Sequence, residues 1–244
     1  MQDGPTTCLV GLGGNVGPVQ DTFAAALQML NNEGCRVMSR SECHRSAPMG
    51  CDAGGTFTNA AACVITELGP FDVLDLLQDV ERRNGRVRTV HWGPRRLDLD
   101  LLFYGQMVIR SERLTVPHPD LWYRRFVLEP LAEIAPEWKH PESAYTIGQL
   151  RERLDQRPLI IELDGFDVLP PIPDRFADGA VHIQSSTDSL WDQSSVQKPF
   201  CFLRRQTGDQ QSQVADESET FRIDVREEDM ARLLDVILSA ALGK

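Results

Sequence analysis

The chain has 244 residues, enough for one hydrophobic core or for one core with an appendage. Its 41% hydrophobic and 25% charged residues are typical of a globular protein, and no apolar run approaches the ~20 residues that a membrane-spanning helix needs. The net charge of -11 argues against general affinity for nucleic acid, because the phosphates would be repelled.

The first half of the chain is predicted to alternate strands with amphipathic helices. A buried strand that runs into a Gly-rich turn is expected first. A strong helix is expected to start at Pro70 and to be closed by Gly85. The predicted strands are 8–17, 35–45 and 57–66, and the predicted helices are 20–31 and 70–84.

The next part of the chain begins with a predicted loop, 86–96, and a strand in LDLDLLFYG (97–105). Helices are predicted at 122–135 and 147–154, and a last strand at 157–163. Several strands are separated by too little chain for a crossover helix. The pattern therefore predicts an α+β fold in which helices pack on a mixed or antiparallel sheet.

The composition changes after Leu163, where Pro-rich and then Ser- and Gln-rich stretches begin. We predict a folded, function-bearing domain over 1–164, a polar and weakly ordered linker over 165–220, and a short strand–helix tail over 221–244. The last two parts form a C-terminal extension. Truncation after Gly165 is expected to leave the activity of the first part intact.

The cellular location is predicted from two features. The amino terminus has no basic segment followed by a long apolar segment, so a secretory signal is not expected. The six cysteines are scattered without the spacing of a zinc site, and we expect reduced, mostly buried thiols. Both features predict a cytoplasmic protein.

Asp98 and Asp100 occupy alternate positions of the predicted strand 97–105 and therefore share one face of it, ~6.6 Å apart. Two carboxylates at this spacing can hold one Mg²⁺ ion, or a pair of ions about 4 Å apart. A half-exposed strand with an acidic outer face is an equally good interpretation of this pattern taken alone.

Arginine is concentrated just before these carboxylates. One loop contains Arg86, Arg88, Arg95 and Arg96, which exceed what two aspartates could neutralise. Mg²⁺ with a triphosphate would use both the aspartates and the arginines, because the metal bridges some phosphate oxygens while the arginines hold the remaining phosphate oxygens. The combination indicates phosphoryl transfer.

Other motifs are less specific. GLGGNVG (11–17) lacks the spacing of a dinucleotide or P-loop site and is interpreted as a tight turn. His118 lies between two prolines that restrict the backbone, which suits a positioned donor, although a structural histidine has the same pattern. Phe57, Trp92 and Phe126 would each be typical of core packing if considered singly.

Several sequence blocks follow one another in order over about residues 7–163. The blocks are GLGGNVG (11–17), APMG (47–50) with FTNAA (57–61), QDVERRNGRVR (78–88), WGPRRLDLDLLFYG (92–105) and RLTVPHPDLWYRRFVLEPLAEIAP (113–136). Together they resemble the 6-hydroxymethyl-7,8-dihydropterin pyrophosphokinase family of folate biosynthesis. The resemblance implies a ferredoxin-like α+β sheet. It also implies transfer of pyrophosphate from ATP to the hydroxymethyl group of the pterin, with release of AMP.

The resemblance further implies roles for individual residues around the phosphates. Asp98 and Asp100 would bind two Mg²⁺ ions and, with Arg86 and Arg95, would form the catalytic group. The residues implied in ATP binding are Gln78, Glu81, Arg88, Trp92, Arg113, His118 and Arg124.

The pterin would be bound by a second set of residues under the same resemblance. This set is Ser46, Ala47, Met49, Phe57, Asn59 and Phe126. The ring would stack between Phe57 and Phe126, and Asn59 would read its polar edge.

Two other functions remain open on the sequence. A metal-dependent nucleotidyltransferase could use the same aspartates and would release free pyrophosphate instead of AMP. A ferredoxin-like RNA-binding module could use the arginine loop, but the net acidity and the missing RNP-type motif count against it. The partners expected are ATP and the pterin, with no nucleic acid, no membrane and no obligate protein partner.

Overall fold

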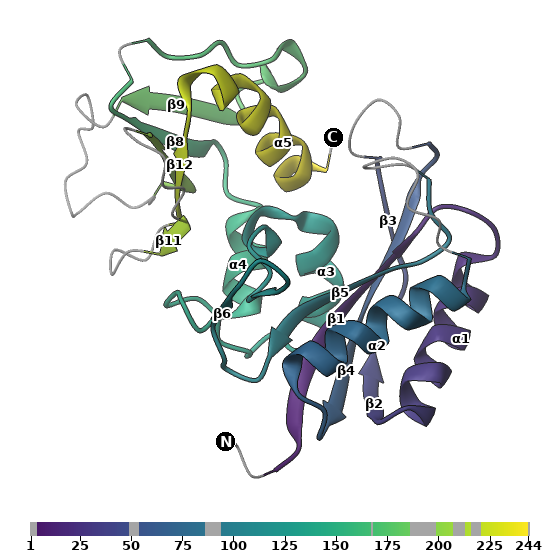
Figure 1. Ribbon diagram of the computed structural model, residues 1–244. Coiled ribbons are helices and arrows are strands. Elements are labelled where there is room, and N and C mark those ends of the chain that lie inside the picture. Colours follow the sequence, from purple (N-terminus) through teal and green to yellow (C-terminus); the bar gives the residue numbers. More distant parts are fainter. Residues whose placement is uncertain are drawn as a thin grey trace.

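The computed structural model of the protein describes residues 4–48, 54–85, 94–166, 168–185, 199–206, 213–215 and 221–243. They form a first unit, residues 4–154, and a second unit, residues 159–243. Helices α3 (Arg125–Ile134) and α4 (Ile147–Arg153) of the first unit lie between the sheets of the two units (Figure 1).

The first unit is built on an antiparallel sheet. Its strands are β1 (Thr6–Gly14), β2 (Cys35–Arg40), β3 (His44–Ser46), β4 (Phe57–Thr66) and β5 (Asp98–Tyr104). They lie in the order β2-β4-β1-β5, and β3 pairs with β4 beyond the end of β2. The predicted antiparallel sheet is confirmed, and β4 has the bounds expected from the sequence.

Helices cover one face of this sheet. They are α1 (Val19–Asn32) and α2 (Pro70–Arg83). Alternate residues of β1 project to this side, so that Val10 packs in one cluster with Phe23 of α1 and Leu77 of α2. Helix α2 begins at Pro70, as predicted. Backbone N–H groups in the first turn have no partner inside a helix, so proline, which has no N–H, loses no hydrogen bond there.

The opposite face of the sheet meets α3 and α4. Leu9 and Ala61 project to this side and belong to one buried cluster with Leu128 of α3. Between β5 and α3 the chain forms β6 (Ile109–Arg110), β7 (Thr115–Val116) and the 3-10 turn η1 (Leu121–Tyr123). Helix α3 begins later than predicted because η1 occupies the preceding residues.

The second unit contains a largely parallel sheet. Its elements are β8 (Leu159–Asp164), η2 (Asp174–Phe176), β9 (Val181–Ser185), β10 (Cys201–Arg205), β11 (Gln213–Ala215), β12 (Phe221–Val225), η3 (Glu227–Asp229) and α5 (Met230–Leu242). The strand order is β11-β12-β10-β8-β9. Strands β9, β8, β10 and β12 are parallel to one another, and β11 is antiparallel to β12.

The range 165–220, for which the sequence predicts a weakly ordered linker, differs in the structure. It contains β9, β10 and β11, and apolar residues such as Val181, Ile183 and Leu203 are buried. These strands are short and stand between polar runs, so they carry little periodicity of their own. Strands β9 and β10 become buried because each of them pairs with β8, which a local pattern does not reveal.

The cores of the two units are continuous. One buried cluster contains Leu9 and Leu128 of the first unit together with Leu163 and Leu238 of the second. The second unit is therefore packed into the hydrophobic core and is not attached only through the chain.

The described cysteines agree with the predicted reduced thiols. Cys8, Cys35, Cys43, Cys63 and Cys201 are all free. Burial raises the pKa of Cys8 and of Cys201 to about 12, which keeps both thiols protonated and unreactive. None of the helices in the described ranges is long and apolar enough to cross a membrane.

Candidate active site

Asp98 and Asp100 project from the face of the first sheet that α3 partly covers. The antiparallel register places Asp98 opposite Gly13 and Asp100 opposite Gly11 of β1, and Asn59 of β4 lies on the other side of Gly13. Residues directly opposite each other share a face. A Cβ added to Gly13 would lie 3.6 Å from Asn59 Oδ1 and 3.7 Å from Asp98 Cβ. The missing side chain therefore leaves open space between a carboxylate and an amide.

Arg95 lies beside the first of these carboxylates. Its Nη1 donates to Asp98 Oδ2 at 2.6 Å, and both side chains are about one-fifth exposed, at 21% and 22%. A partly exposed ion pair of this kind can exchange partners with an incoming phosphate at little cost. Arg95 thus forms an ion pair with Asp98, and its predicted contact with phosphate stays a prediction.

Asn15 ties three segments together at the same end of the sheet. Its Oδ1 accepts the Arg95 N–H at 2.8 Å, its own N–H donates to Arg95 O at 2.9 Å, and its Nδ2 donates to Gly55 O at 3.2 Å. The preceding Gly14 permits this approach, because an added Cβ would lie 2.6 Å from Arg96 O. Sequence reasoning missed Asn15, although an asparagine directly after a Gly-rich strand end was a usable signal.

Glu81 acts on the strand that carries the aspartates. It is 3% exposed on α2, and its Oε1 accepts the N–H of Leu99, the residue between Asp98 and Asp100, at 2.8 Å. Its implied role in ATP binding stays a prediction. Gln78, one turn earlier on α2, is half-buried.

His118 and Arg124 lie on the segment between β7 and α3. His118 donates its backbone N–H to Leu102 O of β5 at 3.0 Å, and its Nδ1 accepts the Asp120 N–H at 3.2 Å. Burial lowers the pKa of His118, and the nearby Asp100 carboxylate opposes this shift. The ring is therefore neutral at pH 7.

Arg124 is held beside this histidine by Asp120, whose Oδ2 accepts from Nη2 at 2.6 Å. The side chain is 14% exposed, and its buried Nε has no hydrogen-bond partner among the described residues. A buried N–H without a partner favours a ligand atom at this position. The guanidinium also lies 5.9 Å from the centre of the Phe126 ring, over its face.

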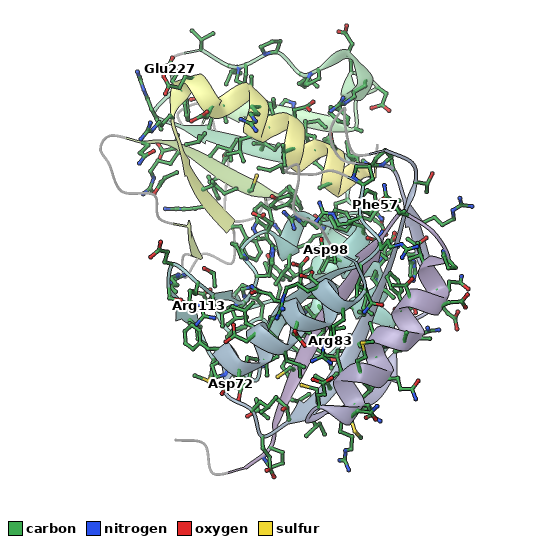
Figure 2. The ribbon with its side chains drawn as sticks, turned by 45° about the vertical axis from the view of Figure 1, so that its right-hand side comes forward. Phe57, Asp72, Arg83, Asp98, Arg113 and Glu227 are labelled. Carbon is green, nitrogen blue, oxygen red and sulfur yellow. The ribbon has the colours of Figure 1, made fainter. Side chains whose placement is uncertain are left out.

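Two of the residues expected around the pterin, Ser46 and Phe57, lie beside Asn59 on β3 and β4. Asn59 is 6% exposed and donates from Nδ2 to Ser46 Oγ at 2.9 Å. Phe57 of β4 pairs with Ser46 of β3 and is half-buried. Phe126 is half-buried in the first turn of α3, and Ala47 is exposed. In Figure 2, Phe57 and Asp98 lie toward one end of the first unit and Asp72 toward the other.

His44, which the sequence left without a role, positions α3 against this region. It lies opposite Asn59 on β3, and its Nε2 is 2.5 Å from Glu133 Oε1 and its Nδ1 3.8 Å from Glu129 Oε2. These contacts join the edge of the sheet to α3, the helix that carries Phe126.

Arg113 is not brought to the aspartates. Its Nη2 donates to Asp75 Oδ1 at 2.5 Å, its guanidinium lies 5.7 Å from the Phe71 ring, and it is more than half exposed. Figure 2 shows it apart from Asp98. The remaining predicted residues lie outside the described ranges, namely Met49, Arg86, Arg88 and Trp92.

The metal chemistry of the site depends on Asp98 and Asp100. Within the described ranges, no group of three or more His, Cys, Asp or Glu side chains could hold a metal ion. Two carboxylates on one face still suit Mg²⁺, which completes its coordination with water and substrate phosphates. The oxygen donors present therefore fit such an ion.

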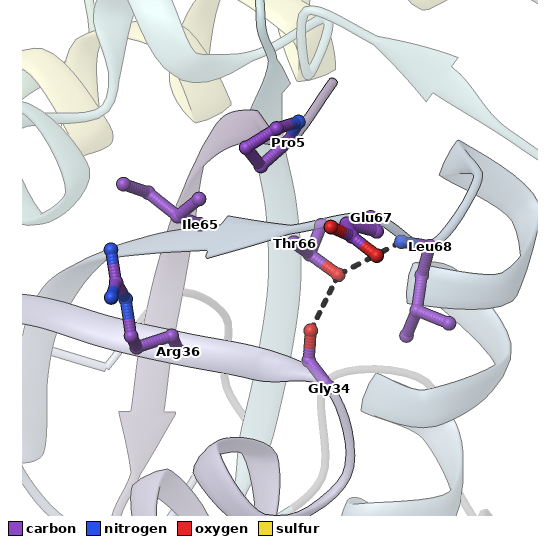
Figure 3. Close-up of a pocket in the computed structure, with 7 residues that line it drawn as sticks. All are labelled: Pro5, Gly34, Arg36, Ile65, Thr66, Glu67 and Leu68. Carbon is purple, nitrogen blue, oxygen red and sulfur yellow. Dashed lines mark hydrogen bonds between the residues drawn. The ribbon is translucent and has the colours of Figure 1, made fainter. Parts of the chain in front are cut away.

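A separate pocket of about 440 Å³ lies at the other end of the sheet (Figure 3). Its lining residues are Pro5, Gly34, Arg36, Ile65, Thr66, Glu67 and Leu68. Thr66 Oγ1 donates to Gly34 O at 2.7 Å and accepts the Leu68 N–H at 3.1 Å, so the hydroxyl is already satisfied. This pocket offers no chemistry related to the aspartates.

Comparison with known proteins identifies a family. Residues 9–136 match the family model described as 7,8-dihydro-6-hydroxymethylpterin-pyrophosphokinase (HPPK). The 2-amino-4-hydroxy-6-hydroxymethyldihydropteridine pyrophosphokinase of Synechocystis is 43% identical over 157 residues, which are 63% of this chain and 80% of that protein. The Haemophilus influenzae protein of the same name is 39% identical over 154 residues, 62% of this chain and 95% of its own.

A solved structure supports the fold alone. A Plasmodium falciparum HPPK-DHPS structure aligns with a TM-score of 0.50 at 13% identity, and it covers 62% of this chain. This chain spans less than half of that longer one, 45%.

Proposed function

This chain belongs to the 7,8-dihydro-6-hydroxymethylpterin-pyrophosphokinase family and transfers pyrophosphate from ATP to the hydroxymethyl group of the pterin in folate biosynthesis, and we propose that it does so beside Asp98 and Asp100. The observation that carries the site is the register that places Asp98 and Asn59 on the two sides of Gly13 and Asp100 opposite Gly11, with Arg95 at 2.6 Å from Asp98. AMP is the other product of such a transfer.

The first unit is proposed to have a ferredoxin-like arrangement. Its main elements follow one another as β1, α1, β2, β4, α2 and β5, and the antiparallel strand order is β2-β4-β1-β5. A sheet of this kind has one face covered by both helices and leaves the other for α3 and the substrates.

Asp98 and Asp100 would hold the Mg²⁺ ions that accompany ATP. When bound, Mg²⁺ would neutralise charge on the phosphate oxygens. Glu81 would keep the two carboxylates in place by holding the Leu99 N–H between them.

Arg95 would bind the phosphates that undergo transfer. Its ion pair with Asp98 is partly exposed, so the guanidinium can turn toward a phosphate oxygen without losing all contact with the carboxylate. A fixed cation at this position stabilises charge that develops on the transferred group and on the departing AMP. Arg86 would add a second cation, and Arg88 and Trp92 would lie on a loop that closes over the site.

His118 would donate a hydrogen bond to ATP. Because its Nδ1 accepts the Asp120 N–H and its lowered pKa keeps the ring neutral, the proton resides on Nε2. This N–H suits a phosphate or ribose oxygen, and the unpartnered Nε–H of Arg124 suits another. Gln78, Glu81 and Arg113 stay predictions as ATP-binding residues.

The pterin would be recognised between the two phenylalanines. Asn59 donates to Ser46 through Nδ2, which leaves Oδ1 facing the open space over Gly13, where it can accept an N–H of the ring. Phe57 and Phe126 would stack on the ring faces. Backbone groups near Ala47 and Met49 would complete the contacts.

The other expectations from the sequence also stay proposals. They are a cytoplasmic location and the absence of an obligate protein partner.

The test is an incubation of the full-length protein with Mg-ATP and 6-hydroxymethyl-7,8-dihydropterin, followed by separation of the nucleotides. AMP that forms only in the presence of the pterin supports the proposal. Free pyrophosphate without pterin diphosphate would indicate a nucleotidyltransferase, and ADP would indicate transfer of a single phosphate. Either result contradicts the proposed function.

A further inference from the structure

The second unit contacts the start of helix α3 through Arg125. The Arg125 Nε donates to Ala241 O in the last turn of α5 at 3.0 Å. Its Nη2 donates to Leu154 O at 2.6 Å and to Asp155 Oδ1 at 2.9 Å, and its Nη1 donates to Glu129 Oε1 at 3.2 Å. The Arg125 side chain is 17% exposed, so its bonds to the carbonyl oxygens of Ala241 and Leu154 are partly shielded from water, whereas the Asp155 carboxylate is 46% exposed.

A second contact lies just before α3. Trp122 of η1 is 3% exposed, and its ring is stacked on Phe221 of β12 with centroids 4.5 Å apart and an interplanar angle of 4°. Phe200 adds a tilted contact at 5.3 Å. The segment from η1 to α3 is thus held on one side by side chains of the second unit.

The first turn of α3 has little support of its own. Its N-cap residue is Arg124, whose side chain makes no capping hydrogen bond. An uncapped helix start frays unless tertiary contacts hold it. Arg125 lies directly between Arg124 and Phe126, the residues assigned above to ATP and to the pterin.

We propose that the second unit positions the pterin-binding end of α3, and that Arg125 is the positioning residue through which it acts. The inference rests on the proposed function, because it needs Phe126 to contact the substrate. Loss of the Arg125 contacts would let the first turn of α3 fray. Phe126 would then have to be ordered when the pterin binds, which weakens binding.

The test compares two arginines that contact the same helix α5. Arg125→Gln removes the tie between α3 and Ala241. Arg175→Gln is the matched control, because Arg175 binds Asp235 at 2.5 Å and Ser239 Oγ at 2.8 Å inside the second unit. Full-length variants are compared by the KM for each substrate, by kcat, and by hydrogen exchange of the amides of residues 124–130.

Arg125→Gln is expected to raise the KM for the pterin roughly fivefold to tenfold, with a smaller effect on the KM for ATP and on kcat. Exchange in the first turn of α3 should become faster. Arg175→Gln should change none of these quantities by more than about twofold. Equal KM values and equal exchange in the two variants would overturn the inference.

A second variant protects the test against a folding defect. If Arg125→Gln unfolds, Phe221→Leu weakens the other contact and should raise the KM for the pterin in the same selective way; an unchanged KM there would also overturn the inference. The proposed function has a separate outcome, since it fails only if the unaltered protein forms no AMP from ATP and the pterin.

Discussion

Asp98 and Asp100 share one face because β5 is a strand, and a third carboxylate keeps that strand in place. Glu81 is almost fully buried and accepts the Leu99 N–H at 2.8 Å, so its role is exerted on the backbone between the two aspartates. Removing a partner from such a buried group is costly, because the remaining polar atom cannot return to water. Glu81 therefore differs from Asp98 and Asp100, the proposed metal ligands, because its carboxylate holds the backbone between them.

Asp98→Asn and Asp100→Asn are each expected to lower kcat by about 100-fold or more, because the substituted amide no longer supplies the charge that a metal–phosphate group needs. AMP formation under saturating Mg-ATP and pterin measures this loss. Asp224→Asn, on a strand of the second unit, is the control and should keep normal activity. Near-normal turnover in either site variant would contradict the metal assignment.

The site also depends on how strand ends are joined, which is a property of elements. Asn15, in the turn after β1, makes three hydrogen bonds. Two of them join it to Arg95 before β5, and the third joins it to Gly55 before β4. Gly14 lets the backbones meet because no Cβ stands in the way. The position of Arg95 relative to Asp98 thus follows from hydrogen bonds at the end of a different strand.

Asn15→Ala should reduce kcat/KM roughly tenfold or more, because Arg95 loses the side-chain acceptor that holds its backbone N–H in place. Steady-state kinetics of AMP release test this expectation. Asn31→Ala is a matched control, since Asn31 Oδ1 also accepts one backbone N–H, from Val37, outside the site. If both variants lose activity to the same extent, Asn15 has no special role.

At the scale of the whole molecule, the extension is part of the fold. Trp122 stacks on Phe221, and buried residues of both units form one cluster. His140 is 6% exposed at this junction, edge-on to Phe103 and to Phe221 with centroids 5.7 Å away in each case. The composition of residues 165–220 indicates a linker, but the packing makes the second unit a structural neighbour of the site.

Truncation after Gly165 is now expected to destabilise the protein, contrary to the expectation from composition. The cut would expose Trp122 and other apolar residues of the shared cluster, and each large side chain returned to water costs roughly 1.5–3 kcal/mol. Thermal unfolding and solubility of the truncated chain measure the effect. A soluble truncated protein with unchanged Tm and AMP formation would show that the first unit is self-sufficient.

Acidification should weaken the fold through His140. Burial lowers its pKa from 6.5 to about 4, so below pH 6.5 the unfolded chain takes up a proton that the folded protein does not. The free energy of unfolding should therefore fall by about 2 kcal/mol between pH 6.5 and 5 from this residue. Urea unfolding at several pH values measures it.

His140→Gln should flatten that pH dependence, and His182→Gln, at an exposed position on β9, should leave it unchanged. Identical pH profiles for the unaltered protein and His140→Gln would show that other groups cause the acid sensitivity.

The amino-acid sequence by itself determined local elements and the shared strand face of Asp98 and Asp100. Strand β4 and helix α2 follow from periodicity and from Pro70, because these signals lie within a few residues of each other. The family resemblance implied the roles of Asp98, Asp100 and Asn59, and these roles stay predictions. Only the tertiary structure decided that Arg113 pairs with Asp75, that Asn15 holds Arg95 and that β9 and β10 join β8. Such contacts join residues far apart in the chain, and no local pattern encodes which distant partner will bury a short strand or neutralise a charge.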